Sequence, residues 1–127
     1  MQPLQPSVLV VDDDRHLCDL LTELLSETGY TVSCAHDGED AWEAVQRRPP
    51  DIILSDITMP RLDGIGLASR LASCGYATPI ILMSAGHRDW TEVRGTFIRK
   101  PFDLDHLLAA LANALSRQAP EMANVTS

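Results

Sequence analysis

The chain has 127 residues, of which 45% are hydrophobic, and this is enough for one domain with a buried core. Acidic residues outnumber basic ones by 18 to 10 and the basic residues form no cluster, so we expect no direct binding to nucleic acid. No apolar run approaches the length that spans a membrane. Three widely spaced cysteines without a Cys-x-x-Cys motif favour reduced thiols and a cytoplasmic protein.

Short apolar runs alternate with segments of helical periodicity along the chain. The runs predicted to be strands are Val8–Val11, Tyr30–Ala35, Asp51–Ser55, Pro79–Ser84 and Thr96–Arg99. Apolar residues recur at helical spacing within Leu17–Leu25, Ala41–Val45, Ile65–Ala72 and Leu104–Leu115. Asp14, Asp37 and Asp103 precede three of these segments and are the predicted helix caps. The alternation predicts an α/β fold, a single doubly wound five-stranded parallel sheet with helices on both faces.

In such a sheet, functional groups gather at the carboxyl ends of the strands. The first predicted strand runs into Asp12 and Asp13, the third ends at Asp56, the fourth at Ser84, and the fifth at Lys100. The first strand is not followed by a glycine-rich phosphate loop, so the dinucleotide and P-loop classes are excluded.

The residue types at these strand ends favour phosphoryl transfer. Two carboxylates about 4 Å apart repel by roughly 4 kcal/mol at an effective dielectric of about 20, a cost that a divalent cation such as Mg²⁺ relieves. One carboxylate can attack phosphorus and become an acyl phosphate, while a hydroxyl and an amine share the charge on the phosphoryl oxygens. Lys100 is the only lysine among ten basic residues, which suggests that its compact ammonium has a specific use.

Four segments, "VLVVDDD", "DIILSDITMPRLDG", "ILMSA" and "IRKPF", together resemble the response-regulator receiver domain of two-component signalling. They occur in family order, and the resemblance extends from about Ser7 to Arg117. It implies a chemotaxis-regulator-like fold with the flavodoxin-like strand order 2-1-3-4-5. It also implies a domain over residues 7–117, and we expect residues 1–6 and 118–127 to be flexible.

The resemblance implies a role for each matching residue. Asp56 is the implied phosphoacceptor, with Ser84 and Lys100 beside it. The implied Mg²⁺ ligands are Asp12, Asp13, Asp56 and the backbone carbonyl of Thr58, and the implied switch pair is Ser84 with Phe97. The Met59-Pro60 and Asp63-Gly64 pairs match the loop that shapes the site in the family.

The implied function is that of a regulator that is phosphorylated by a histidine kinase or a histidine phosphotransfer protein. It is not an enzyme beyond promoting its own phosphorylation and dephosphorylation, and its output is altered binding to a downstream protein partner. Two alternatives stay open. One is a receiver-like scaffold that is never phosphorylated, and the other is a phosphatase that uses Asp12 as nucleophile and Asp14 as acid/base.

The segment between Ser84 and Lys100 is shorter than the family usually has. Its sequence, "AGHRDWTEVRG", has only Trp90 and Val93 as large apolar residues, too few for one stripe of a three-turn helix. We therefore expect the fourth helix of the family pattern to be shortened or absent, with a mobile loop that phosphorylation orders.

Overall fold

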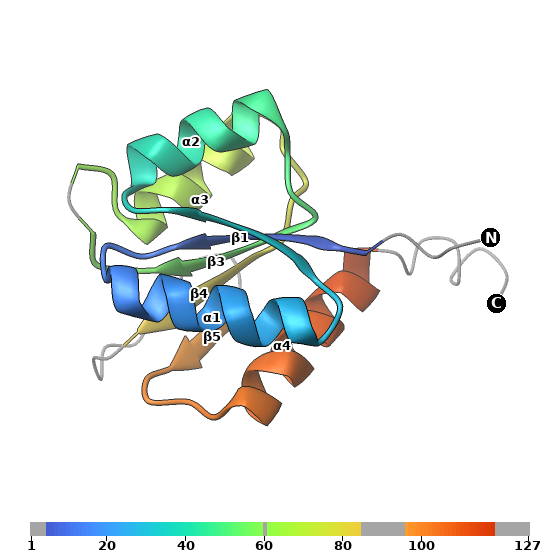
Figure 1. Ribbon diagram of the computed structural model, residues 1–127. Coiled ribbons are helices and arrows are strands. Elements are labelled where there is room, and N and C mark those ends of the chain that lie inside the picture. Colours follow the sequence, from blue (N-terminus) through green and yellow to red (C-terminus); the bar gives the residue numbers. More distant parts are fainter. Residues whose placement is uncertain (1–4, 60, 85–95, 119–127) are drawn as a thin grey trace, which may run out of the picture.

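The computed structural model describes residues 5–59, 61–84 and 96–118, and Figure 1 shows their arrangement. Five parallel strands form one sheet in the order β2-β1-β3-β4-β5, as the sequence predicted. The strands are β1 (Ser7–Val11), β2 (Thr31–Ala35), β3 (Ile52–Asp56), β4 (Ile80–Ser84) and β5 (Thr96–Arg99). Because all five run in one direction, their carboxyl ends meet along a single edge of the sheet.

The three central strands are apolar because both faces of the sheet are covered. Val8, Val10 and Ile52 point to one face, and Leu9 and Ile53 point to the other, and all are buried. β2 lies at the edge of the sheet and leaves three of its five residues exposed, which explains its weaker apolar pattern.

Among the described residues, two helices cover each face of the sheet (Figure 1). The helices are α1 (Arg15–Glu27), α2 (Gly38–Arg47), α3 (Gly64–Ser73) and α4 (Leu104–Gln118). Side chains of α1 and α4 belong to one buried cluster, and side chains of α2 and α3 belong to the other.

Aspartates begin the helices, as predicted. Asp14 accepts hydrogen bonds from the amides of the first turn of α1, and Asp37 does the same for α2. Asp103 accepts from the amide of His106 at 2.7 Å at the start of α4. Asp63 caps α3, and this cap was not predicted from the sequence.

Several strand ends differ by one residue from the prediction, and both ends of β3 are among them. β3 begins at Ile52 because Asp51 instead closes the amino end of the sheet, where its carboxylate accepts from the Ser7 amide at 2.8 Å. β3 extends to Asp56, whose neighbour Ile57 donates its amide to the Met83 carbonyl of β4 at 3.1 Å. This pairing fixes the backbone around Asp56 against the central sheet.

Gly64 allows the loop after β3 to approach the backbone at the end of that strand closely. Its amide donates to the Ile57 carbonyl at 2.8 Å, and a Cβ placed on it would lie 2.4 Å from the Asp56 carbonyl oxygen. Only glycine fits that approach, so Gly64 sets the path by which α3 leaves the site.

Pro60 and the segment 85–95, with Trp90 and the predicted short fourth helix, lie outside the described residues. Within the described residues, no helix is both long enough and apolar enough to cross a membrane.

Candidate functional site

Three carboxylates converge at the carboxyl edge of the sheet. Asp12 and Asp13 follow β1, and Asp56 ends β3, the strand that pairs with β1. Each offers an oxygen that lies within 4.8 Å of those of the other two. Asp12 is only 1% exposed, Asp56 is half-buried and Asp13 is exposed, so the cluster opens to solvent on one side.

Lys100 is placed between the two least exposed carboxylates. Its Nζ lies 3.3 Å from Asp12 Oδ2 and 3.5 Å from Asp56 Oδ1. Its backbone amide donates to the Ser84 carbonyl at 2.8 Å, which attaches the end of β5 to the end of β4. A cis peptide bond joins Lys100 to Pro101. Lys100 thus pairs with two of the three carboxylates, and among the described residues an excess of negative charge remains at the cluster.

The surroundings of Asp56 also act on the ionisation of its carboxyl group. Burial raises its pKa, and the nearby Asp12 charge raises it further, while Lys100 acts in the opposite direction. In the metal-free protein, the ionised form of Asp56 is therefore less favourable than that of a carboxylate in water.

The third aspartate of the "DDD" run has a different role, as predicted. Asp14 Oδ1 accepts from the amides of His16 and Leu17 at 3.0 and 3.2 Å, which caps α1. The Asp14 amide donates to Asp12 Oδ1 at 2.9 Å and helps to fix the orientation of that carboxylate.

A hard divalent cation fits this cluster. Carboxylate and carbonyl oxygens are the ligands that Mg²⁺ prefers, and the surplus negative charge beside Lys100 is what such an ion would neutralise. Thr58, whose backbone carbonyl is an implied ligand, lies two residues after Asp56 in the exposed start of the loop to α3.

Ser84 ends β4 at the same edge of the sheet and is half-buried. Phe97 lies on β5 opposite Leu82, two residues before Ser84 along β4, and packs against the buried cluster on the α2 and α3 face. The two expected switch residues thus lie on neighbouring strands, Ser84 at the carboxyl edge of the sheet and Phe97 further from that edge.

Two contacts to the Asp12 backbone were not predicted from the sequence. The Cys18 thiol donates to the Asp12 carbonyl at 3.4 Å, and His36 Nδ1 lies 3.3 Å from the same oxygen. These residues come from α1 and from the segment after β2, so no local sequence signal could have linked them to Asp12.

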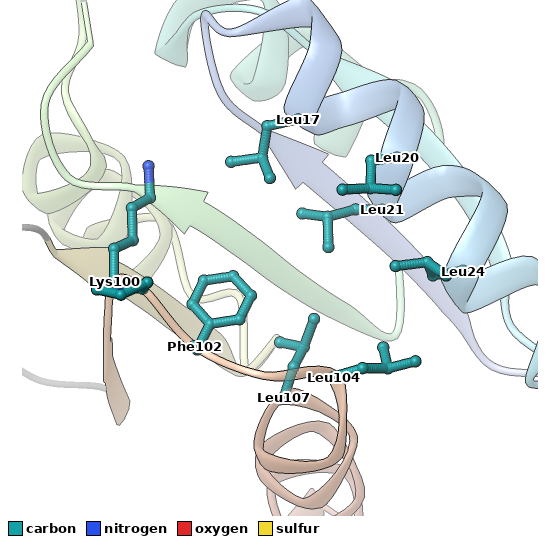
Figure 2. A pocket seen from close by; sticks show the side chains of 9 residues that line it. Leu17, Leu20, Leu21, Leu24, Lys100, Phe102, Leu104 and Leu107 are labelled. Atoms are coloured by element: carbon teal, nitrogen blue, oxygen red, sulfur yellow. The ribbon is translucent and has the colours of Figure 1, made fainter.

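An apolar pocket of about 570 Å³ adjoins the carboxylate cluster. Figure 2 shows that it lies between α1 and the start of α4, with leucines from both helices and Phe102 on its walls. Lys100 lines the pocket and also reaches the carboxylates with its Nζ, so the two features share this side chain. Leu20 of α1 lines the pocket too and is 51% exposed.

The sequence matches the family model of the response regulator receiver domain over residues 8–112. It is 38% identical over 120 residues to response regulator MprA of Mycobacterium avium, a match that covers 90% of this chain and 53% of MprA. The identity to MprA of Mycobacterium ulcerans is 40% over 116 residues, which covers 87% of this chain and 50% of that protein. The chain thus spans about half the length of these relatives.

Solved structures have the same architecture. The receiver domain of the Francisella response regulator 1452 superposes with a TM-score of 0.83 at 29% identity, covering 90% of this chain and 99% of that one. The chemotaxis protein CheY4 of Vibrio cholerae superposes with a TM-score of 0.79 at 28% identity, covering 87% of this chain and 99% of that one.

Proposed function

Because the chain belongs to the response regulator receiver domain family, we propose that it accepts a phosphoryl group on Asp56 in a Mg²⁺-dependent reaction. The observation that carries this proposal is the convergence of Asp12, Asp13 and Asp56 at one strand edge, with Lys100 paired to two of them. The donor is a histidine kinase or a histidine phosphotransfer protein.

The transfer is a displacement at phosphorus. A carboxylate oxygen of Asp56 attacks the phosphorus of a phosphohistidine, a P–O bond forms, and the P–N bond breaks with its electron pair returning to the imidazole. Lys100 opposes the raised pKa of Asp56 and so favours the ionised nucleophile. After transfer, its ammonium and the Ser84 hydroxyl would pair with phosphoryl oxygens.

Asp12, Asp13, Asp56 and the Thr58 carbonyl would hold the Mg²⁺ ion. When bound, the ion supplies positive charge that neutralises the carboxylates and the transferring group. Asp12 is fixed for this role by the Asp14 amide and by Lys100, and Asp13 offers an exposed carboxylate on the solvent side.

We propose the apolar pocket between α1 and α4 as the surface on which the protein donor docks. A phosphohistidine on another protein has to reach Asp56, and Lys100 joins this pocket directly to the carboxylates. Exposed Leu20 gives the surface an apolar group that association would bury.

The output is altered binding to a downstream protein, with Ser84 and Phe97 as the switch pair. We propose that residues 7–117 form the receiver domain and that the protein works in the cytoplasm, without contacting nucleic acid or membrane through this chain. Its only chemistry is on its own carboxylate, so it is a signalling protein and not an enzyme with an external substrate.

Two contacts disfavour the alternative of a phosphatase that uses Asp12. The Asp12 side chain is 1% exposed and is occupied by the Asp14 amide and by Lys100, whereas the Asp56 side chain is 15% exposed. The Asp14 carboxylate, which that mechanism needs as acid/base, caps α1. Both features favour Asp56 as the nucleophile.

The test is phosphoryl uptake from acetyl phosphate, followed by intact-protein mass with and without Mg²⁺. We expect one phosphoryl group on the parent protein in Mg²⁺ only, none on Asp56→Asn, and normal uptake on Asp51→Asn, whose carboxylate lies at the opposite end of β3. Absence of uptake by the parent under all conditions would support the unphosphorylated scaffold instead.

A further inference from the structure

Two cysteines from different elements lie close together where the first turn of α1 packs against β2. Cys18 of α1 is fully buried, and Cys34 of β2 is exposed. Cys34 Sγ lies 3.7 Å from the Cys18 carbonyl oxygen and 3.2 Å from the Thr22 hydroxyl, one helical turn further along α1. α1 packs against β2 here, and the third cysteine, Cys74, is exposed at the end of α3 on the other face of the sheet.

The strand geometry explains why Cys34 is both accessible and close to Cys18. Side chains alternate along a strand, so Cys34 points to the same face as Val32, which packs against the cluster that contains Cys18. β2 is the edge strand of the sheet, and this leaves the Cys34 side chain open to solvent.

The electrostatic surroundings of Cys34 favour the thiolate. The neighbouring Cys18 side chain lowers the pKa of Cys34 to about 6, helped by the Thr22 hydroxyl and by His36, while partial burial and the Asp19 charge act in the opposite direction. The same pairing, together with burial, raises the pKa of Cys18, so Cys18 keeps its proton when Cys34 is ionised. A thiolate that is accessible and has a second thiol beside it has the typical arrangement of a redox-sensitive cysteine.

We propose that Cys34 is a site of oxidation by hydroperoxides and that Cys18 is its resolving partner, giving a disulfide between α1 and β2. In the first step the Cys34 thiolate attacks one peroxide oxygen, the O–O bond breaks, and Cys34 becomes a sulfenic acid while the other oxygen leaves as hydroxide. In the second step the Cys18 sulfur gives up its proton and attacks the Cys34 sulfur, and the S–O bond breaks to release water. Two thiols lose two electrons in total, and one hydrogen peroxide is reduced to two waters.

This disulfide would act on Asp12, because the Cys18 thiol is a hydrogen-bond donor to the Asp12 carbonyl. Oxidation removes that donor. The oxidation itself does not depend on Asp56 or on phosphorylation, so it can be tested separately from the proposed function.

The test treats the full chain with a small molar excess of hydrogen peroxide and maps the products by mass spectrometry after digestion without reductant. We expect a peptide pair joined through Cys18 and Cys34, a net loss of two hydrogens, and restoration by dithiothreitol. Cys74 should stay reduced and serves as the internal control. A parent protein that stops at sulfenic acid on Cys34 with Cys18 free, or that oxidises Cys74 first, would overturn the proposal.

Two variants separate the steps. Cys18→Ser keeps a hydroxyl that can donate to the Asp12 carbonyl, and it should accumulate a Cys34 sulfenic acid that a dimedone probe captures. Cys34→Ser should take up no oxygen at Cys18, which is buried. Circular dichroism tests whether each variant is folded. If a variant does not fold, the peptide map of the oxidised parent protein alone tests the proposed disulfide.

Alkylation by iodoacetamide tests the reactivity of Cys34 directly. At about pH 6, a thiol with a pKa of about 6 is half ionised, and after its lower nucleophilicity is allowed for, it should react roughly tenfold faster than a model-peptide cysteine with a pKa of about 8.5. Equal rates at that pH would mean that the surroundings do not activate Cys34.

Discussion

The two ends of β3 carry aspartates in opposite situations. At the amino end, Asp51 is exposed and its carboxylate accepts hydrogen bonds from the Ser7 amide and hydroxyl at 2.8 and 3.3 Å. At the carboxyl end, Asp56 is half-buried, faces Asp12, and shares with it the one ammonium of Lys100. Asp51 joins two strands and its carboxylate is hydrogen-bonded, whereas Asp56 belongs to a cluster of three carboxylates, of which Lys100 pairs with two.

One strand thus combines a structural aspartate with a functional one. A carboxylate that accepts hydrogen bonds from its own fold contributes to stability, while a buried cluster of like charges lowers stability and is kept for binding or chemistry. Substitutions at the two ends of β3 should therefore have different effects on phosphoryl uptake and on stability.

The largest expected effect is that of Lys100→Ala. It removes the only positive charge described beside Asp12 and Asp56, so phosphoryl uptake from acetyl phosphate should slow by about a hundredfold or more at saturating Mg²⁺. The rate of phosphoprotein formation measures this. Arg99→Ala removes an exposed charge one residue earlier and should have little effect, and equal losses in the two variants would remove the specific role of Lys100.

A second expected effect is stabilisation by Mg²⁺. An ion that relieves repulsion among the three carboxylates should raise the free energy of unfolding by about 2.7 kcal/mol at a hundredfold excess over its dissociation constant. Asp13→Ala should weaken this response and raise the stability of the metal-free protein, whereas Asp51→Asn should keep the full response. Urea unfolding with and without Mg²⁺ is the measurement, and a parent protein that does not respond would argue against the metal site.

A third comparison separates the docking surface from the chemistry. Leu20→Glu places a charge on the pocket between α1 and α4, so transfer from a cognate phosphohistidine protein should slow by about tenfold, through weaker association. Uptake from acetyl phosphate should not change, because this small donor needs no docking. Gln46→Glu adds the same charge on α2, across the sheet, and is the control. Equal slowing with both donors would mean that Leu20 acts on the site itself.

The smallest expected effect is on stability as a function of pH. The pKa of Asp56 is raised in the folded protein, so the folded state binds that proton more tightly than the unfolded state does. The favourable contribution of protonated Asp56 is present at acid pH and is lost as the pH rises through its folded pKa. Without Mg²⁺, Asp56→Asn should therefore stabilise the protein at about pH 7, by on the order of 1 kcal/mol, and much less at about pH 3.

Asp51→Asn is the matched variant at the other end of β3. It loses a charged acceptor for the Ser7 amide, so at neutral pH it should be unchanged or slightly less stable than the parent. Urea unfolding of both variants at the two pH values gives the comparison. Stabilisation of the same size by both would show that general negative charge, and not the cluster, is responsible.

The sequence was sufficient for the fold because its signals were local and agreed with one another. Uninterrupted apolar runs marked the buried strands, and Asp14 and Asp37 marked helix starts through their short side chains. Parallel strands then bring their carboxyl ends together, so the nearness of Asp12, Asp56 and Lys100 followed from topology.

The remaining contacts depend on tertiary packing that no local pattern encodes. How the helices pack on the sheet determines three of these contacts. They are the approach of Gly64 to the Asp56 carbonyl, the hydrogen bond from Cys18 to the Asp12 carbonyl, and the position of Cys34 beside α1. The start of β3 also lies one residue later than predicted, because Asp51 forms hydrogen bonds with Ser7 instead of continuing the strand.

The residue that carries the phosphoryl group can be located chemically. The protein is incubated with acetyl phosphate and Mg²⁺, the acyl phosphate is reduced with borohydride, and the site of the resulting homoserine is found by peptide sequencing in the mass spectrometer. We predict that the homoserine derives from Asp56 and that Asp51, at the far end of the same strand, stays unmodified. Homoserine derived from Asp12 would contradict Asp56 as the phosphoacceptor and support the phosphatase mechanism.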